Sequence, residues 1–309
     1  MSDANNATGV SGEAQAEADT PEVVHSPGSS RLQHFVRRYR GEPLAVASTV
    51  IFLLLALIAV FAPLLAPYDP NDTDLIAKFT PPLTDGHLLG TDDLGRDAFS
   101  RLLYGSRITL VAPFIAVGVG LVLGLPAGLF AGFRGGWVDV VFSRTSDAVM
   151  ALPGLILAIA FIAARGPGTT NAMIAVGMGF APRIFRIVRG ATLTVRGETY
   201  IEASRSSGAS TTRLIGSHVF PNILPPLIVQ ASVLLGFAVL TEAGLSFLGI
   251  GVQPPQASWG VLLRRGFDHL QRASWLSWPP GLMIMILTLC FQFIGDGLRD
   301  SLGRETRRE

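Results

Sequence analysis

The sequence predicts an all-α integral membrane protein with six transmembrane helices. Of its 309 residues, 49% are hydrophobic and 15% are charged, whereas about a quarter of a soluble domain is charged. The mean hydropathy is +0.44. The apolar residues gather in separate runs of roughly 20, which is the length needed to cross the hydrocarbon core of a bilayer. Composition and run length together therefore exclude an ordinary soluble protein.

Six apolar segments account for the predicted transmembrane helices. The first has no charged residue, and a polar segment separates it from the second. Short turns separate the third and fourth segments from their neighbours. The predicted spans lie at residues 43–68, 108–133, 138–164, 169–188, 221–249 and 279–298.

The two ends of the chain are predicted to be polar tails. Residues 1–30 contain no Lys or Arg and are rich in Ala, Ser, Gly and Pro, a composition typical of a disordered segment. They lack the basic start and apolar centre of a secretory signal. The predicted organisation is a cytoplasmic tail at 1–30, a basic anchor with the first helix at 31–68, an extracytoplasmic segment at 69–107, a core at 108–303 and a cytoplasmic tail at 304–309.

The basic residues predict the orientation. Arginines follow the first tail at 31–40, recur between 183 and 213, and end the chain between 299 and 308. The opposite side receives fewer basic residues, including Lys78 and Arg165. Because Lys and Arg are enriched in cytoplasmic loops, we expect a multi-pass protein of the cell membrane with both termini in the cytoplasm. The loop at 198–220 is then cytoplasmic as well.

This loop is a polar island between apolar runs. Gly208 suits the left-handed conformation that ends a helix, and Ser210 is a good N-cap for the next one. In that second helix the residues on one face are Leu214, Ile215, His218 and Val219. Pro221 stands where a new helix would begin. The pattern predicts two short helices joined at a glycine elbow, a shape that could dock into a groove on another protein.

The order of residues in the elbow resembles the E-A-A loop of ABC importer permeases. The matching residues are Glu202-Ala203-Ser204, Gly208 and His218-Val219-Phe220-Pro221. Ser204 replaces the usual second alanine, and His218 and Phe220 replace isoleucine and leucine. The resemblance implies a coupling helix held by an ATPase subunit, with Glu202 making a polar contact, Ala203 keeping the helix thin and Gly208 making the turn. Ser204, His218 and Pro221 complete the implied coupling set.

Two further strings resemble the C-type permease subunit of dipeptide, oligopeptide and nickel importers. They are H-L-L-G-T-D-D-L-G-R-D from His87 to Asp97, and E-A-G-L-S-F-L-G-I-G-V-Q-P-P with a later S-W-G from Glu242 to Gly260. The resemblance covers residues 43–303. It implies the type I ABC importer permease fold and half of a pore. The implied partners are a second, B-type permease subunit, two ABC ATPase subunits or domains, and an extracytoplasmic substrate-binding protein.

No catalytic or cofactor site is predicted on this chain. The phosphate-binding loop G-x-x-x-x-G-K-[ST] needs a lysine after glycine, and the only lysine, Lys78, follows Ala77. ATP and magnesium are therefore expected on a partner ATPase. Neither H-E-x-x-H nor G-x-S-x-G occurs. A net charge of +1 gives no electrostatic reason to bind nucleic acid, and the single cysteine, Cys290, excludes a Cys-based zinc site.

Charged residues inside the spans are few. Glu242 lies deep in the fifth span, where an ionisable group indicates function by default. The two roles open to Glu242 are a contact in the pore or gate and a purely structural one. Arg144 and Asp147 are three residues apart and are expected to pair with each other.

Small and aromatic residues suggest packing surfaces. Gly120, Gly124, Gly128 and Gly132 form a stripe on the second span. Such a stripe indicates close helix packing, either within the chain or at a subunit interface that lines the pathway. The tryptophans between 251 and 278 are expected to lie at headgroup level.

The outer segment is not predicted to bind a metal ion. Asp92, Asp93, Asp97 and His87 could gather around a cation, but Arg96 and Arg101 stand close enough to neutralise them.

The predicted function is the permease subunit of an ATP-driven importer that forms half of a pore for di- or oligopeptides. The alternatives are a nickel or metal-chelate permease of the same family, an ion-driven secondary transporter, which would usually show internal repeats or relay charges, and a membrane-bound enzyme. Only a permease of this kind should co-purify with an ATPase.

Overall fold

The computed structural model describes residues 29–302, and this part of the chain is helical, with two isolated β-bridges and no strand. The predicted tails at 1–30 and 304–309 lie outside the described residues, except that residues 29–30 begin the first helix. The helices are α1 Ser29–Arg40, α2 Pro43–Leu65, α3 Ala98–Arg134, α4 Gly136–Met150, α5 Gly154–Arg165, α6 Thr169–Arg196, α7 Thr199–Ser206, α8 Thr211–Leu214, the π-helix η1 Ile215–Val219, α9 Phe220–Phe247, α10 Trp259–Asp268, the 3₁₀ helix η2 Ser274–Leu276 and α11 Trp278–Leu302.

Five helices in the described range are long and apolar enough to cross a membrane. They are α2, α3, α6, the helix from Thr211 to Phe247, and the helix from Ser274 to Leu302. The sixth predicted span, at 138–164, is not one straight helix: α4 and α5 meet at a bend of 88°. Pro153, which has no N–H, precedes Gly154 at this bend, and a residue before proline disfavours helical geometry. Counted as one broken span, the pair brings the total to the predicted six.

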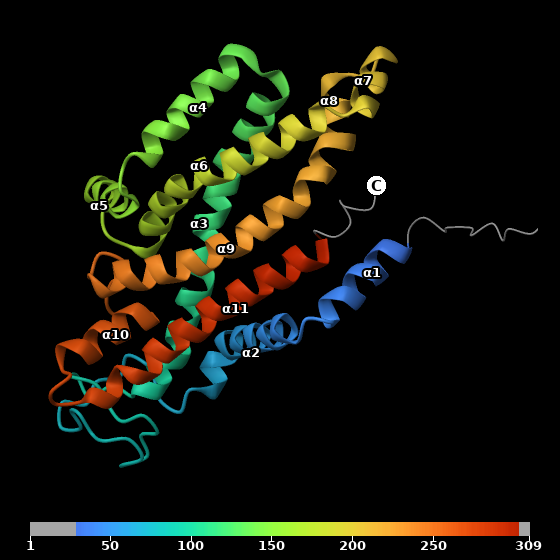
Figure 1. Cartoon of the computed structure of the whole chain (residues 1–309). Coiled ribbons are helices and arrows are strands. Elements are labelled where there is room, and N and C mark those ends of the chain that lie inside the picture. Colours follow the sequence, from blue (N-terminus) through green and yellow to red (C-terminus); the bar gives the residue numbers. More distant parts are fainter. Residues whose placement is uncertain (1–28, 303–309) are drawn as a thin grey trace, which may run out of the picture.

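The helices run between two ends of the molecule (Figure 1). The elbow formed by α7 and α8, together with α1 and the end of α11, lies toward one end. The segment that joins α2 to α3 lies at the opposite end, beside α10. The predicted cytoplasmic elements thus share one end.

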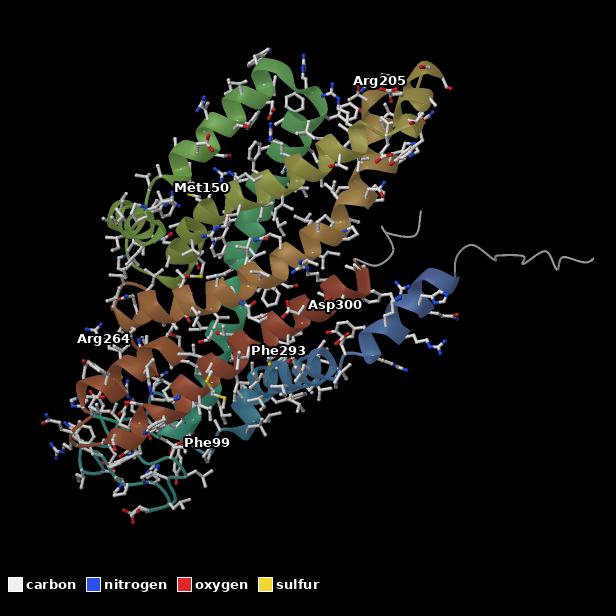
Figure 2. The ribbon with its side chains drawn as sticks, in the orientation of Figure 1. Phe99, Met150, Arg205, Arg264, Phe293 and Asp300 are labelled. Carbon is white, nitrogen blue, oxygen red and sulfur yellow. The ribbon has the colours of Figure 1, made fainter. Side chains whose placement is uncertain are left out.

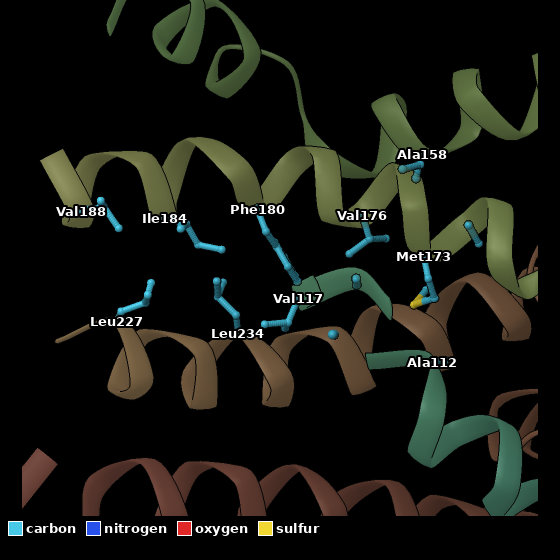
Figure 3. Close-up of a cluster of buried hydrophobic side chains, with 14 of the residues drawn as sticks. Ala112, Val117, Ala158, Met173, Val176, Phe180, Ile184, Val188, Leu227 and Leu234 are labelled. Atoms are coloured by element: carbon cyan, nitrogen blue, oxygen red, sulfur yellow. The ribbon is translucent and has the colours of Figure 1, made fainter. Parts of the chain in front are cut away.

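The glycine stripe of α3 packs against α6 within this chain. A Cβ atom added to Gly124 would lie 2.5 Å from the carbonyl oxygen of Ala181, and one added to Gly128 would lie 2.8 Å from the Cβ of Val188. Ile184 and Val188, which contact this stripe, also point toward Leu227 and other residues of α9 (Figure 3). Of the two interpretations of the stripe, the structure supports packing within the chain.

Two ion pairs join α4 to α6. Arg186 donates a hydrogen bond of 2.7 Å to Asp147. Arg189 donates two bonds to Asp139, of which the bond from Nη2 is 2.6 Å long. The expected pairing of Asp147 with Arg144 is wrong, because α6 brings a guanidinium from another helix to the same carboxylate.

The segment before α3 is held by its own charged residues. Asp92 accepts bonds from the Arg96 side chain at 2.6 and 2.8 Å, and Arg265 binds Asp93 at 2.9 Å. Asp97 caps α3 by accepting from the Ser100 N–H at 2.7 Å. Arg96 and, at 3.7 Å, Arg101 pair with Asp92 as expected, whereas Asp93 pairs with Arg265 and Asp97 with His87.

The expected headgroup position of the tryptophans is wrong for one of them. Trp259 is 1% exposed, and its indole N–H donates to the Leu102 carbonyl at 3.0 Å. Trp278, by contrast, is exposed. The buried indole fixes the start of α10 to α3.

Candidate functional site

The elbow has the local geometry that the sequence predicts. Helix α7 ends before Gly208, whose φ of +85° lies in the left-handed region. Ser210 then caps α8 by accepting a bond of 3.4 Å from the Arg213 N–H. A Cβ atom added to Gly208 would meet nothing within 4 Å, so its backbone conformation rather than crowding makes glycine suitable here.

The second arm of the elbow continues into α9. The expected new helix at Pro221 is not seen, because α8, η1 and α9 follow one another as a single helix from Thr211 to Phe247. The wide π turn lets the Phe220 N–H bond to the Ile215 carbonyl. Pro221 lacks an N–H and stands just after this turn. A π turn inside an α-helix often occurs at a functional site.

The elbow is anchored by its apolar residues and exposes its small and polar ones. Ile201, Leu214 and Val219 are at most 1% exposed, and the last two belong to the main hydrophobic core. The predicted coupling residues divide as follows: Glu202, Ala203, Gly208 and Pro221 are exposed, and Ser204 and His218 are half-buried. The exposed set forms a surface that another protein can contact.

His218 helps to join the two arms. Its ring lies 5.8 Å from the ring of Tyr200 on α7. The Asn222 amide donates to the His218 carbonyl at 2.8 Å and to the Tyr200 hydroxyl at 3.3 Å. These contacts brace α7 against the start of α9, so the angle of the elbow is fixed by side chains from both arms.

A basic recess lies between the elbow and the end of α3. It has a volume of about 300 Å³ and is lined by Arg134, Arg196 and Arg205 together with Phe133 and three other residues, none of them acidic. The Arg205 guanidinium stacks 5.5 Å from the Phe133 ring, and Figure 2 shows this arginine at the end of the molecule. In the sequence these arginines indicated only the orientation of the chain.

A larger cavity opens beside the break between α4 and α5. Its volume is about 460 Å³, and its walls come from this break, α6 and α9. Met150, labelled in Figure 2, lies at the break. The walls are mostly apolar, with Arg183 and Thr241 as the polar side chains. This cavity was not predicted from the sequence, although the arginines at 183, 186 and 189, three residues apart in an apolar helix, were a usable signal.

Glu242 does not line the cavity, although its neighbour Thr241 does. The Glu242 carboxyl is 1% exposed and accepts a bond of 2.7 Å from the Ser246 hydroxyl one turn later. Its other oxygen has no hydrogen-bond partner in the part of the chain that the structure describes. A pore or gate contact for Glu242 stays a prediction.

The chain matches two family models. Residues 124–308 match the binding-protein-dependent transport system inner membrane component, and residues 30–82 match the N-terminal TM domain of oligopeptide transport permease C.

Similar proteins match over most of their length. The probable D,D-dipeptide transport system permease protein DdpC of Escherichia coli is 41% identical over 85% of this chain and 88% of its own. The di/tripeptide transport system permease protein DppC of Pseudomonas aeruginosa is 40% identical over 93% of this chain and 95% of its own. The glutathione transport system permease protein GsiD of Pectobacterium atrosepticum is 39% identical over 87% and 90%.

A solved structure shares the fold. The MetNI methionine ABC transporter, in an inward-facing conformation, superposes with a TM-score of 0.54 and 25% identity, covering 63% of this chain and 93% of that chain. The all-helical type I permease fold is thereby confirmed. On these matches, the chain belongs to the family of binding-protein-dependent transport system inner membrane components, the permease subunits of ABC importers.

Proposed function

We propose that this permease subunit forms half of the pore of an ATP-driven importer of di- or oligopeptides. The observation that carries the substrate class is the similarity to DdpC, DppC and GsiD at about 40% identity over nearly the whole chain. Their names specify D,D-dipeptides, di- and tripeptides, and glutathione, all of which are short peptides or peptide-like.

The proposed mechanism is alternating access, with the elbow as the lever. Leu214 and Val219 are embedded in the core, and the helix that carries them runs without interruption into α9. Further along, Phe237 and Thr241 of the same helix line the large cavity. A displacement of the elbow by an ATPase would therefore move one wall of the cavity.

The exposed residues of the elbow have distinct proposed roles. Glu202 makes a polar contact with the ATPase, and Ala203 keeps α7 thin enough to enter a groove. Gly208 sets the turn. Ser204, His218 and Pro221 support the same surface, and the basic recess beside it supplies a second, positively charged contact.

The subunit is proposed to act in a complex. A second permease chain would close the open side of the cavity, and two ATPase subunits or domains would bind ATP and magnesium. An extracytoplasmic protein would deliver the peptide. No catalytic step is assigned to this chain. The end with the elbow, α1 and the end of α11 is proposed to face the cytoplasm.

The nickel alternative has less support. The permeases named above carry peptide names, and none of the three is named for a metal. An ion-driven secondary transporter would need no ATPase, whereas the chain belongs to a family of subunits that work with one.

Uptake by cells tests the substrate class. Cells that lack the gene should lose accumulation of a labelled dipeptide, keep accumulation of labelled nickel, and regain the first when the gene is returned. Loss of nickel accumulation with unchanged dipeptide accumulation would contradict the peptide assignment.

A further inference from the structure

Arg183, Arg186 and Arg189 stand three residues apart on α6. The second and third form ion pairs, and within the described residues the first does not. Arg186 pairs with Asp147, and Arg189 pairs with Asp139. Within residues 29–302, no carboxylate forms an ion pair with Arg183. Its guanidinium lies 5.8 Å from the centre of the Phe237 ring on α9.

Arg183, which the pattern of basic residues placed on the cytoplasmic side, lies inside a candidate membrane span, Thr169–Arg196. It is the fifteenth of the 28 residues of α6, counted from Thr169. A charged side chain within a membrane span is costly, and such residues usually face a water-filled cavity or pathway and take part in its function. An arginine kept there without an acidic partner therefore indicates a ligand that supplies the negative charge.

The surroundings of Arg183 suit a small amphipathic ligand. Arg183 is the one charged residue among those lining the cavity of about 460 Å³, a volume in the range of small-molecule sites. The remaining walls are largely apolar. The Thr241 hydroxyl donates to the Phe237 carbonyl at 2.8 Å, and its oxygen can still accept a hydrogen bond from a ligand.

We propose that Arg183 binds the C-terminal carboxylate of a peptide in transit while the apolar walls accommodate its side chains. This proposal rests on the proposed function. A guanidinium forms two parallel charge-assisted hydrogen bonds with a carboxylate. Every unmodified peptide has that group whatever its sequence, so this contact would select for peptides without selecting among them. The Phe237 ring holds the guanidinium in the cavity when no peptide is present.

Photolabelling of the purified complex tests the contact without the binding protein, which could itself select the carboxylate. The probes are alanyl-benzoylphenylalanine, which has no acidic side chain, and its C-terminal amide. The free acid should label the segments around Met150 and Phe237 about tenfold more than the amide, as expected for the loss of a charge-assisted pair. Equal labelling by acid and amide would overturn the proposal.

Variants assign the effect to one side chain. Arg183→Gln should remove the preference for the acid, and Arg183→Lys should retain part of it. Arg186→Gln is the matched control, because the same change three residues along α6 affects a pair with Asp147 outside the cavity. A preference for the acid that survives in Arg183→Gln would contradict the proposal. Loss of the second permease chain from the complex in this variant would also contradict it, because that result would assign Arg183 to an ion pair between subunits.

Uptake in proteoliposomes separates this inference from the function on which it rests. With binding protein and ATP, the Arg183→Gln complex should import about tenfold less dipeptide than the wild-type complex. If the wild-type complex imports the dipeptide and the Arg183→Gln complex imports it equally well, the role of Arg183 is refuted and the proposed function stands. Absence of dipeptide import by the wild-type complex would refute the proposed function.

Discussion

Gly124 of α3 lies so close to α6 that a Cβ atom added there would be 2.5 Å from the carbonyl oxygen of Ala181. The same relationship recurs in the other direction, since a Cβ on Gly177 of α6 would lie 2.4 Å from the carbonyl oxygen of Ala116. Backbone therefore meets backbone along this interface. The interface joins α3, whose end lies beside the elbow, to α6, which lines the large cavity.

Gly124→Ala should destabilise the protein because the methyl group can be accommodated only if α3 and α6 move apart. Overpacking of this kind costs about 1–3 kcal/mol, and the melting temperature of the purified complex should fall. Gly118→Ala is the control, since a Cβ on Gly118 of the same helix would meet nothing within 4 Å. Equal melting temperatures for the two variants would contradict the packing described.

Gly208→Val should abolish uptake while the complex stays assembled. The φ of +85° is unfavourable for a β-branched residue, and the added Cβ atom would meet nothing within 4 Å. The elbow would have to change its angle, and the exposed face of α7 would turn away from the ATPase. Uptake and co-purification of the ATPase are the measurements.

Gly216→Ala is the control for the elbow. Gly216 lies in η1 and does not have a positive φ, and a Cβ there would also meet nothing within 4 Å. This variant should import at the wild-type rate. Normal uptake by the Gly208→Val variant would contradict the claim that uptake depends on the glycine turn of the elbow.

The two ion pairs between α4 and α6 should differ in their contribution to stability. The Asp147–Arg186 side chains are both 51% exposed, and exposed pairs contribute about 0–1 kcal/mol. The Asp139–Arg189 pair is more buried and has two hydrogen bonds. Asp139→Asn should therefore lower the melting temperature more than Asp147→Asn. The reverse order would show that α4 packs differently against α6.

Glu242→Gln should leave uptake and stability close to wild type. A glutamine oxygen can accept the same bond from the Ser246 hydroxyl. Glu242→Leu removes the acceptor and leaves that buried hydroxyl without it, so its melting temperature should be lower. Loss of uptake by Glu242→Gln at an unchanged melting temperature would instead support a gate role that requires the charge.

Local chemistry predicted the elbow well. The φ of Gly208 and the cap at Ser210 depend on neighbours in sequence, and both were expected from it. Features that depend on distant residues were missed or wrong. Asp147 has its partner on α6 rather than on its own helix, and Trp259 is buried against α3.

The cavity illustrates the same limit. Its walls come from three parts of the chain. Only their assembly shows that Arg183 forms no ion pair within residues 29–302, whereas Arg186 and Arg189 each pair with an aspartate. The break at Pro153 was signalled by the sequence, but the apolar residues on both sides of it gave the stronger pattern of a continuous span.

ATP hydrolysis by the complex that co-purifies with this chain tests the central claim most directly. The binding protein is added with either a dipeptide or a nickel chelate, and the rate is compared with that of the unliganded binding protein. We expect stimulation by the dipeptide alone, because a loaded binding protein would drive the pore and its coupled ATPases through the cycle. Stimulation by nickel alone, or a preparation that contains no ATPase, would contradict the account.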